Sequence, residues 1–207
     1  TKEDPSKPRF VAGSIGPTTK TTSLSPNVSD PGYRAITFNQ LVDSYYKQVD
    51  GLMKGGSDLI LIETIFDTLN AKAALFAIEK YAEDKKLDIP IMVSGTISDK
   101  AGRTLSGQTV EAFLNSVSHI NLLSIGLNCS FGAEGLYPHL RELASKAPFY
   151  ISVYPNAGLP NEFGDYDETA ERMAVSMKPF LENNLVNIIG GCCGTTPEHI
   201  KKISKLA

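Results

Sequence analysis

The chain has 207 residues, of which 42% are hydrophobic and 21% charged, so it can bury the core of one ordinary globular domain. Its formal net charge of -3 and scattered lysines and arginines provide no basic surface for nucleic acid, and its longest apolar runs are too short to cross a bilayer. The three cysteines, two of them adjacent, argue against a disulfide framework and indicate a reducing, cytoplasmic environment.

The predicted elements follow one repeated pattern. Residues 1–8 are polar and lack the apolar stretch of a signal peptide, so we interpret them as a connector and 9–207 as one domain. Within that domain, short β-branched runs alternate with amphipathic stretches. The predicted strands begin with the runs 10–12, 59–62, 91–93, 122–125, 149–153 and 186–189. The predicted helices cover 35–54, 70–81, 109–117, 134–144 and 169–182, and a last one opens at Thr196 and Pro197.

Six strand–helix units in a row predict an α/β fold with a parallel sheet. Two architectures compete, the doubly wound open sheet and the (β/α)8 barrel. No G-x-G-x-x-G segment follows the first predicted strand, which removes the main sign of a dinucleotide-binding fold. A barrel needs eight units and typically about 250 residues, so six units fit a barrel that lacks its first two. The pattern by itself leaves both architectures open and favours the barrel slightly.

Polar and reactive residues gather where the predicted strands end. In a parallel barrel these ends share one face, which carries the active site. The residues concerned are Glu63, Ser94, Gly95, Thr96, Asn128, Cys129, Asn156, Cys192 and Cys193. We therefore expect all three cysteines to converge, although Cys129 precedes Cys192 by 63 residues.

Three converging cysteines are typical of few kinds of site. A nucleophilic cysteine needs a histidine base, but the three histidines lie on or beside helical patterns, where we interpret them as structural or surface residues: His119, His139 and His199. A thiol redox pair would use C-x-x-C, which is absent. Three thiolates around one Zn²⁺ fit better, with the flanking glycines allowing a sharp turn. The spacing supports an alternative equally well: Cys129 would be a small buried hydrophobic residue, and the Cys192–Cys193 pair would simply end a strand.

Two segments resemble the homocysteine methyltransferase family. Residues 190–199 (GGCCGTTPEH) are similar to its closing motif, and 126–130 (GLNCS) to its other zinc segment. Residues 62–74, 94–97, 102–108 and 154–161 resemble the cobalamin-dependent methionine synthase branch more than the betaine-dependent one. Residues 11–18 resemble that branch's third strand and following loop, and the similarity runs from about 9 to 203.

The resemblance implies a (β/α)8 TIM barrel of which this chain carries about the last six units. The family's Asp-Gly segment on the first strand and its Glu-Thr-Asn-type segment on the second do not occur here. We therefore expect an N-terminal barrel segment as a partner. Unless that segment is present as a separate chain, we expect this chain to be inactive by itself and either unstable or self-associating. The folate-binding and cobalamin-binding modules of a parent enzyme are the other implied partners.

The implied function is Zn²⁺-dependent activation of L-homocysteine for methyl transfer from methylcobalamin, held on a neighbouring module, to give methionine. One alternative is a stand-alone homocysteine methyltransferase that uses betaine or a sulfonium donor. A second is a structural zinc domain without turnover, whose site would be closed by a fourth protein ligand.

The resemblance also implies roles for single residues. Cys129, Cys192 and Cys193 would bind the metal, and Glu63 would bind the substrate ammonium, unless it pairs with a local lysine or caps the helix after Asp67. The other predicted substrate-binding residues are Ser94, Gly95, Thr96, Asn128 and Asn156. We expect Asn128 to orient Cys129. We expect the Asn156 side-chain oxygen to be a displaceable fourth metal ligand, the alternative being that it stabilises its own turn.

Overall fold

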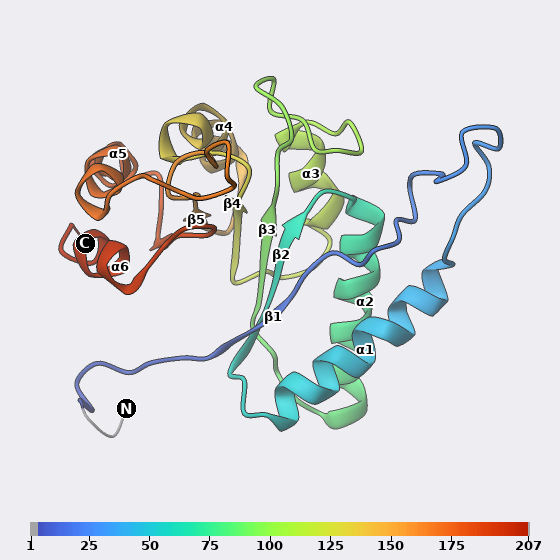
Figure 1. Cartoon of the computed structure of the whole chain (residues 1–207). Helices are drawn as coiled ribbons and strands as arrows, with labels where there is room; N and C mark the ends of the chain where they lie inside the picture. Colours follow the sequence, from blue (N-terminus) through green and yellow to red (C-terminus); the bar gives the residue numbers. More distant parts are fainter. Residues whose placement is uncertain (1–3, 207) are drawn as a thin grey trace.

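Six strands alternate with six helices along residues 4–206, the part of the chain that this computed structural model describes (Figure 1). The strands are β1 (Ala12–Ile15), β2 (Leu59–Ile65), β3 (Ile91–Gly95), β4 (Ser124–Asn128), β5 (Tyr150–Tyr154) and β6 (Ile188–Ile189). The helices are α1 (Phe38–Lys54), α2 (Thr68–Lys85), α3 (Val110–Val117), α4 (Ala133–Lys146), α5 (Ala170–Glu182) and α6 (Pro197–Ile203). The first three residues of the expected connector, and residue 207, lie outside the described range.

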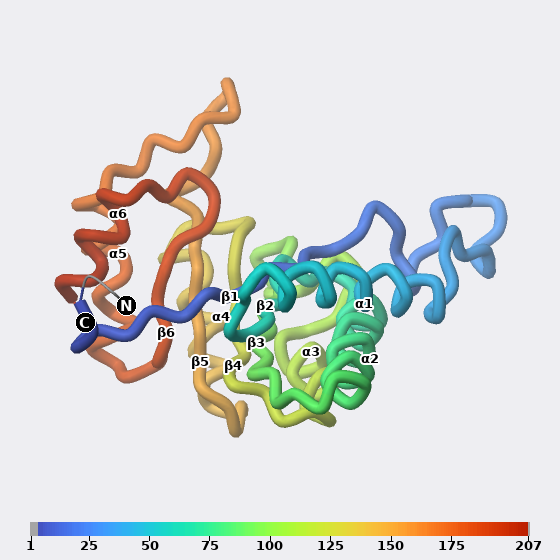
Figure 2. Tube along the Cα trace, turned by 90° about the horizontal axis from the view of Figure 1, so that it is seen from below, coloured from blue at the N-terminus to red at the C-terminus, as the bar shows by residue number. Residues whose placement is uncertain are grey.

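The strand order decides between the two expected architectures. All neighbouring strands are parallel, and their order in the sheet is β1-β2-β3-β4-β5-β6, the same as in the chain. A doubly wound sheet reverses its strand order at a switch point, whereas a barrel adds each strand beside the previous one. The described strands form the curved wall of a partial (β/α)8 barrel with helices on its outer side (Figure 2). The barrel prediction is confirmed.

The two faces of the sheet differ in composition. Alternate residues such as Ile62, Val93 and Ile125 point outward and are buried in one core with the helices. The residues between them include small and polar ones, such as Ser94, Gly126 and Ser152, and these face the inside of the curve. Strand ends on this inner face can therefore carry polar chemistry without disturbing the helix-packed core.

Several element boundaries differ from the predicted ones by a few residues. Strand β1 begins at Ala12 instead of residue 10, because its pairing with β2 starts there and the preceding Phe10 is 71% exposed. Helix α1 begins at Phe38 instead of residue 35, because Thr37 and Gln40 form a capping box. Such local hydrogen bonds determine where a helix begins, and the spacing of apolar residues does not reveal them.

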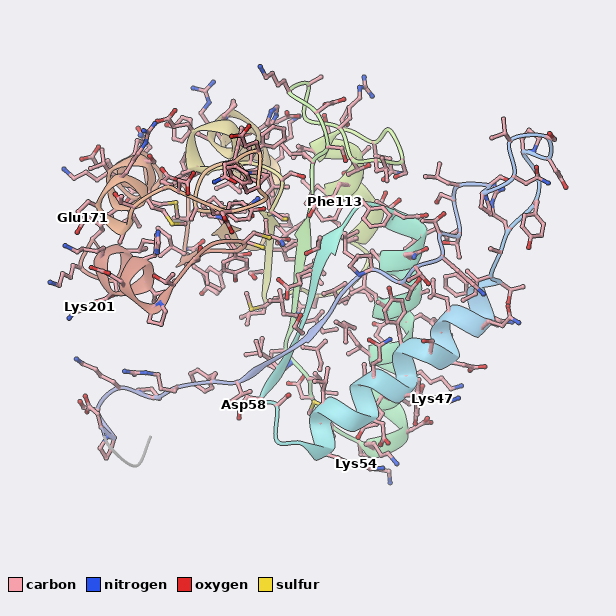
Figure 3. The ribbon with its side chains drawn as sticks, viewed as in Figure 1. Lys47, Lys54, Asp58, Phe113, Glu171 and Lys201 are labelled. Carbon is pink, nitrogen blue, oxygen red and sulfur yellow. The ribbon has the colours of Figure 1, made fainter. Side chains whose placement is uncertain are left out.

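The outer helices carry most of the charge. Lys47 and Lys54 extend from α1, and Glu171 and Lys201 from α5 and α6, on the side of each helix that faces away from the sheet (Figure 3). An ion pair of 2.7 Å joins Lys202 of α6 to Glu171 of α5. None of the helices within residues 4–206 has the length and apolar character needed to span a membrane.

Gly126 permits the close approach of β4 and β5. A Cβ atom at this position would lie 1.9 Å from the Ser152 carbonyl oxygen and 2.3 Å from its Oγ. We expect Gly126→Ala to lower the free energy of unfolding by about 1–3 kcal/mol, because a buried backbone atom would have to move. Gly51→Ala on α1 is the matched control, since a Cβ there meets nothing within 4 Å. Urea unfolding of the full chain measures both, and equal stabilities would contradict the packing argument.

Candidate metal centre

The three cysteines converge at the carboxyl ends of β4 and β6. Cys129 directly follows β4, and Cys192 and Cys193 lie in the loop after β6. The Sγ atom of Cys193 is 3.7 Å from that of Cys129 and 3.9 Å from that of Cys192, and all three Sγ atoms lie within 4.8 Å of one another. All three are half-buried free thiols. The convergence expected from the strand ends is therefore confirmed.

This spacing suits one tetrahedral metal ion. Sulfur ligands about 2.3 Å from Zn²⁺ in a tetrahedron are about 3.8 Å apart, close to the two shorter sulfur–sulfur distances here. Within residues 4–206, this is the one group of at least three cysteine, histidine or acidic side chains close enough to share a metal. No fourth side chain of those types joins it, so three sulfurs leave one coordination position for another ligand.

An unusual backbone conformation turns Cys129 toward the other two cysteines. Cys129 and Ser130 have φ angles of 63° and 61°, in the left-handed region that non-glycine residues rarely adopt. The Cys129 N–H donates to the Tyr154 carbonyl at 3.1 Å, and its carbonyl accepts from the Phe131 N–H at 2.7 Å. These bonds keep the tight turn that ends β4 in place. Such strained residues gather at functional sites, where the surrounding structure holds them.

The second cysteine loop is fixed to the loop after β5. The Cys192 N–H donates to the Pro155 carbonyl, and the Cys193 carbonyl accepts from the Ala157 N–H, both at 2.8 Å. The next residue, Gly194, has a φ of 77°, which suits glycine. The predicted sharp turn is confirmed, and it lets two adjacent side chains point to the same place.

Burial and sulfur neighbours change the acidity of the cluster. Burial, then the nearby Cys129, raises the pKa of the Cys192 thiol to about 12, although the Asn128 amide acts in the opposite direction. Without a metal this thiol is therefore protonated and neutral at pH 7. Binding of a cation must displace its proton. Burial, and then Cys193, also raises the pKa of the Tyr166 phenol, which places this side chain beside the same sulfurs.

Glu63 lies near the end of β2 with a hydroxyl as its partner. The Ser14 Oγ of β1 donates to the Glu63 Oε1. The cap of α2 is Asp67, whose carboxylate accepts from two backbone N–H groups, so the helix-capping alternative for Glu63 is wrong. None of the ion pairs between described residues involves Glu63. After burial, its charge contributes to a raised pKa of Tyr154 at the end of β5. The carboxylate thus lies on the inner face and could still form an ion pair with a bound cation.

The predicted residues of β3 separate into different roles. Ser94 is fully buried on the inner face, and its Oγ has no hydrogen-bond partner among the described residues. Gly95 faces the helices instead, since a Cβ there would lie 3.0 Å from the Phe113 ring of α3. The Thr96 hydroxyl donates to the Asn128 carbonyl at 3.0 Å and so supports the end of β4. Of these three, Ser94 presents an unused polar atom inside the barrel.

Asn128 contacts a different cysteine from the one expected. Its Nδ2 lies 3.8 Å from the Sγ of Cys192, whereas we expected it to orient Cys129, its neighbour in the chain. Cys129 follows β4 in a left-handed conformation, so the pleat of the strand does not determine where its sulfur lies relative to the Asn128 amide. The same amide hydrogen-bonds to Thr64 of β2, a residue that the sequence analysis did not single out. Its position next to Glu63 was the only signal.

Asn156 lies beneath the second cysteine loop. Its side-chain Oδ1 accepts from the Cys193 N–H at 3.2 Å, and its own N–H donates to the Phe131 carbonyl at 3.0 Å. The side chain is 2% exposed. This bond reaches a loop 37 residues away and not the turn of Asn156 itself. The oxygen is thus adjacent to Cys193, and its role as a displaceable metal ligand stays a prediction.

His199 has a structural role. Its Nδ1 pairs with Thr196 in a capping box at the start of α6, and its Nε2 is 2.8 Å from the Glu168 carbonyl. None of the three histidines belongs to the cysteine cluster within the described chain. A cavity of about 550 Å³ between the N-terminal ends of α4 and α5 does not include the cysteines either. The cavity and the cysteine cluster are therefore separate features of the structure.

Comparison with known proteins identifies the family. The model of the family described as homocysteine S-methyltransferase matches residues 1–207. The chain belongs to this family. The apo form of the homocysteine methyltransferase MmuM from Escherichia coli superposes with a TM-score of 0.70 and 21% identity, over 96% of this chain and 62% of that chain. The metallated form of the same protein superposes with a TM-score of 0.67 and 21% identity, over 96% of this chain and 61% of that chain. Homocysteine S-methyltransferase family membership rests on the family match, and the superposition shows the shared fold.

The chain spans less than two thirds of the length of these structures. An oxidized form of the same E. coli protein matches with a TM-score of 0.62 and 20% identity, over 80% of this chain and 52% of that chain.

Proposed function

We propose that the protein binds L-homocysteine through a Zn²⁺ ion held by Cys129, Cys192 and Cys193, and that the substrate sulfur then accepts a methyl group to give methionine. The observation that carries this proposal is the spacing of the three sulfurs: two of the distances match the edge of a zinc tetrahedron, and all three atoms lie within 4.8 Å of one another. Family membership supports the substrate. The metallated form of the E. coli relative supports the metal.

The chemistry follows from the donor set. Bound Zn²⁺ would hold the substrate thiol as its thiolate, which is the nucleophilic form. Three cysteine thiolates and one divalent cation carry a formal charge of -1, which keeps an additional sulfur electron-rich. The role of the three cysteines is therefore to position a nucleophile, and no carbonyl is polarised.

Other residues would hold the amino-acid part of the substrate. Glu63 is a carboxylate without an ion-pair partner among the described residues and would accept hydrogen bonds from the substrate ammonium. Ser94 offers a buried hydroxyl without a partner on the same inner face. Glu63 lies on β2 and Ser94 on β3, between β1 and β4. In this proposal they would orient the substrate so that its sulfur reaches the metal-binding cysteines.

We propose methylcobalamin, held on a neighbouring module, as the methyl donor. The segments 62–74 and 154–161 support this choice, because they resemble the cobalamin-dependent branch. The folate- and cobalamin-binding modules of a parent enzyme and a cytoplasmic location belong to the same proposal. Turnover of homocysteine by the full-length protein, assayed separately with methylcobalamin, betaine and a sulfonium donor, distinguishes the donors. Activity with betaine or the sulfonium compound only would overturn this choice.

X-ray absorption at the zinc edge tests the site itself. We expect three sulfurs and one light atom in the free protein, with the Asn156 oxygen as the light atom, and four sulfurs once homocysteine has displaced it. Asn156→Ala should alter the spectrum of the free protein and leave that of the homocysteine complex unchanged. A free protein that already has four sulfurs, or a spectrum that homocysteine does not change, would contradict the proposal.

A further inference from the structure

The end of β2 contains a strained residue that the proposed chemistry does not use. Thr64 has a φ of 59°, a conformation that is a genuine outlier for a β-branched side chain. The pairing of β2 with β3 also shifts there, because Ile62 pairs with Val93 while Ile65 pairs with Gly95. Two residues of β2 therefore face one residue of β3, which is a β-bulge. Such features persist only when the surroundings hold them.

Asn128 holds this bulge through two hydrogen bonds. The Thr64 N–H donates to the Asn128 Oδ1 at 3.0 Å, and the Asn128 Nδ2 donates to the Thr64 Oγ1 at 2.9 Å. Asn128 is fully buried, so no water competes for these groups. A backbone N–H can only donate, and it therefore requires the oxygen of the amide on its side. Thr64 thus determines which way the Asn128 amide is turned.

The orientation of this amide matters for the sulfur cluster. With Oδ1 turned toward Thr64, Nδ2 lies 3.8 Å from the Sγ of Cys192. One Nδ2 hydrogen bonds to the Thr64 hydroxyl, and the other is free to bond to the sulfur. Hydrogen bonds to an ionised acceptor are stronger than those to a neutral one, so the N–H would favour Cys192 as a thiolate. The reversed amide would place a carbonyl oxygen against that sulfur.

We propose that Thr64 is a positioning residue of the metal centre: while its backbone N–H sets the orientation of the Asn128 amide, its hydroxyl accepts one Nδ2 hydrogen and thereby directs the other at the Cys192 sulfur. The proposal rests on the proposed zinc function. It also explains why a strained bulge lies next to Glu63. The bulge connects β2, which carries Glu63, to the Asn128 amide, which contacts Cys192. The proposed substrate-binding and metal-binding parts of the site therefore keep a fixed geometry.

The test compares zinc affinities of the full-length protein and its Thr64 variants, measured by competition with a chromophoric chelator. Thr64→Val keeps the β-branched shape and removes the hydroxyl, and we expect its affinity to fall by roughly tenfold or more. Thr64→Ser keeps the hydroxyl and should bind zinc within about threefold of the natural protein, as a conservative rescue. Equal affinity in Thr64→Val and the natural protein would overturn the proposal, as would equal losses in Thr64→Val and Thr64→Ser.

Thr64→Gly covers the case in which the valine variant does not fold. Glycine adopts a φ near 59° without strain and also lacks the hydroxyl. A loss of zinc affinity in this variant supports the role of the hydroxyl, and unchanged affinity overturns it.

The absorption spectrum of the Co²⁺-substituted protein is a second measurement, and it should not change if Thr64 has a purely structural role. The sulfur-to-Co²⁺ charge-transfer band reports electron density at the sulfurs, so Thr64→Val should shift it and Thr64→Ser should not. If the shift is absent while the natural protein binds metal, only the Thr64 proposal fails. If the natural protein binds no metal, the proposed function itself fails.

Discussion

Replacement of any one of Cys129, Cys192 and Cys193 by serine should weaken Zn²⁺ binding about 100-fold. Apparent binding free energies of structural zinc sites with four ligands are about 10–16 kcal/mol, so one thiolate accounts for roughly 3 kcal/mol. Ser130→Gly is the matched control, because Ser130 neighbours Cys129, is outside the cluster and has a φ of 61° that glycine adopts readily. Chelator competition under reducing conditions measures each variant. Full zinc affinity in all three single variants would refute a shared site.

The same measurement should depend on pH in a defined direction. Because burial and neighbouring sulfurs raise the pKa of Cys192 to about 12, its proton is present in the metal-free protein throughout the neutral range. Zinc must displace that proton, so the apparent affinity should rise with pH, by about tenfold per pH unit for each proton released. An affinity that is constant between pH 6 and 8 would show that the cysteines are not bound as thiolates.

Glu63→Gln should weaken homocysteine binding by about 10- to 100-fold and leave the zinc content unchanged. Hydrogen bonds to a charged group contribute about 1.5–3 kcal/mol, and the amide cannot replace the carboxylate as the partner of an ammonium. The matched ligand is 4-mercaptobutanoate, which has the same thiol and carboxylate but no amino group. Titration calorimetry on the full-length protein should show a large effect of the substitution on homocysteine affinity and almost none on 4-mercaptobutanoate affinity.

Two outcomes would contradict this role for Glu63. Equal losses for both ligands would mean that the substitution disturbs the strand end and not an ammonium contact. Unchanged homocysteine affinity would mean that Glu63 does not reach the substrate. Glu134→Gln provides a control for the loss of one negative charge, because Glu134 lies in the first turn of α4 and belongs to no contact described for the cysteine cluster.

Much of the site could be predicted because, in a parallel sheet, the residues that follow each strand all lie at the same end of the sheet. Each apolar run indicates a strand, and the polar residue that follows it must lie at the same end of the sheet as its counterparts. The convergence of Cys129, Cys192 and Cys193 was predicted on this basis. The helix starts at Thr109, Thr169 and Thr196 were also close to prediction, since cap residues act within a few residues of the chain.

The hydrogen-bond partners of side chains on different strands could not be predicted in the same way. Asn128 was expected to orient Cys129, but its amide contacts Cys192, which the loop after β6 brings to the end of β4. The left-handed conformation of Thr64 depends on a buried amide 64 residues away, and nothing in the sequence around Thr64 requires it. The Asn156 oxygen similarly bonds to the Cys193 backbone in a distant loop.

The sequence by itself determined the strand–helix alternation, the kind of residue at each strand end and the capacity of three cysteines for one metal ion. The tertiary structure decided the barrel over the open sheet through the sequential order of its parallel strands. It also decided which side chains support which cysteine. The physical reason is the range of the interactions: periodicity and capping act within a few residues, whereas strand order, register and the orientation of a buried amide depend on groups that only the folded chain brings into contact.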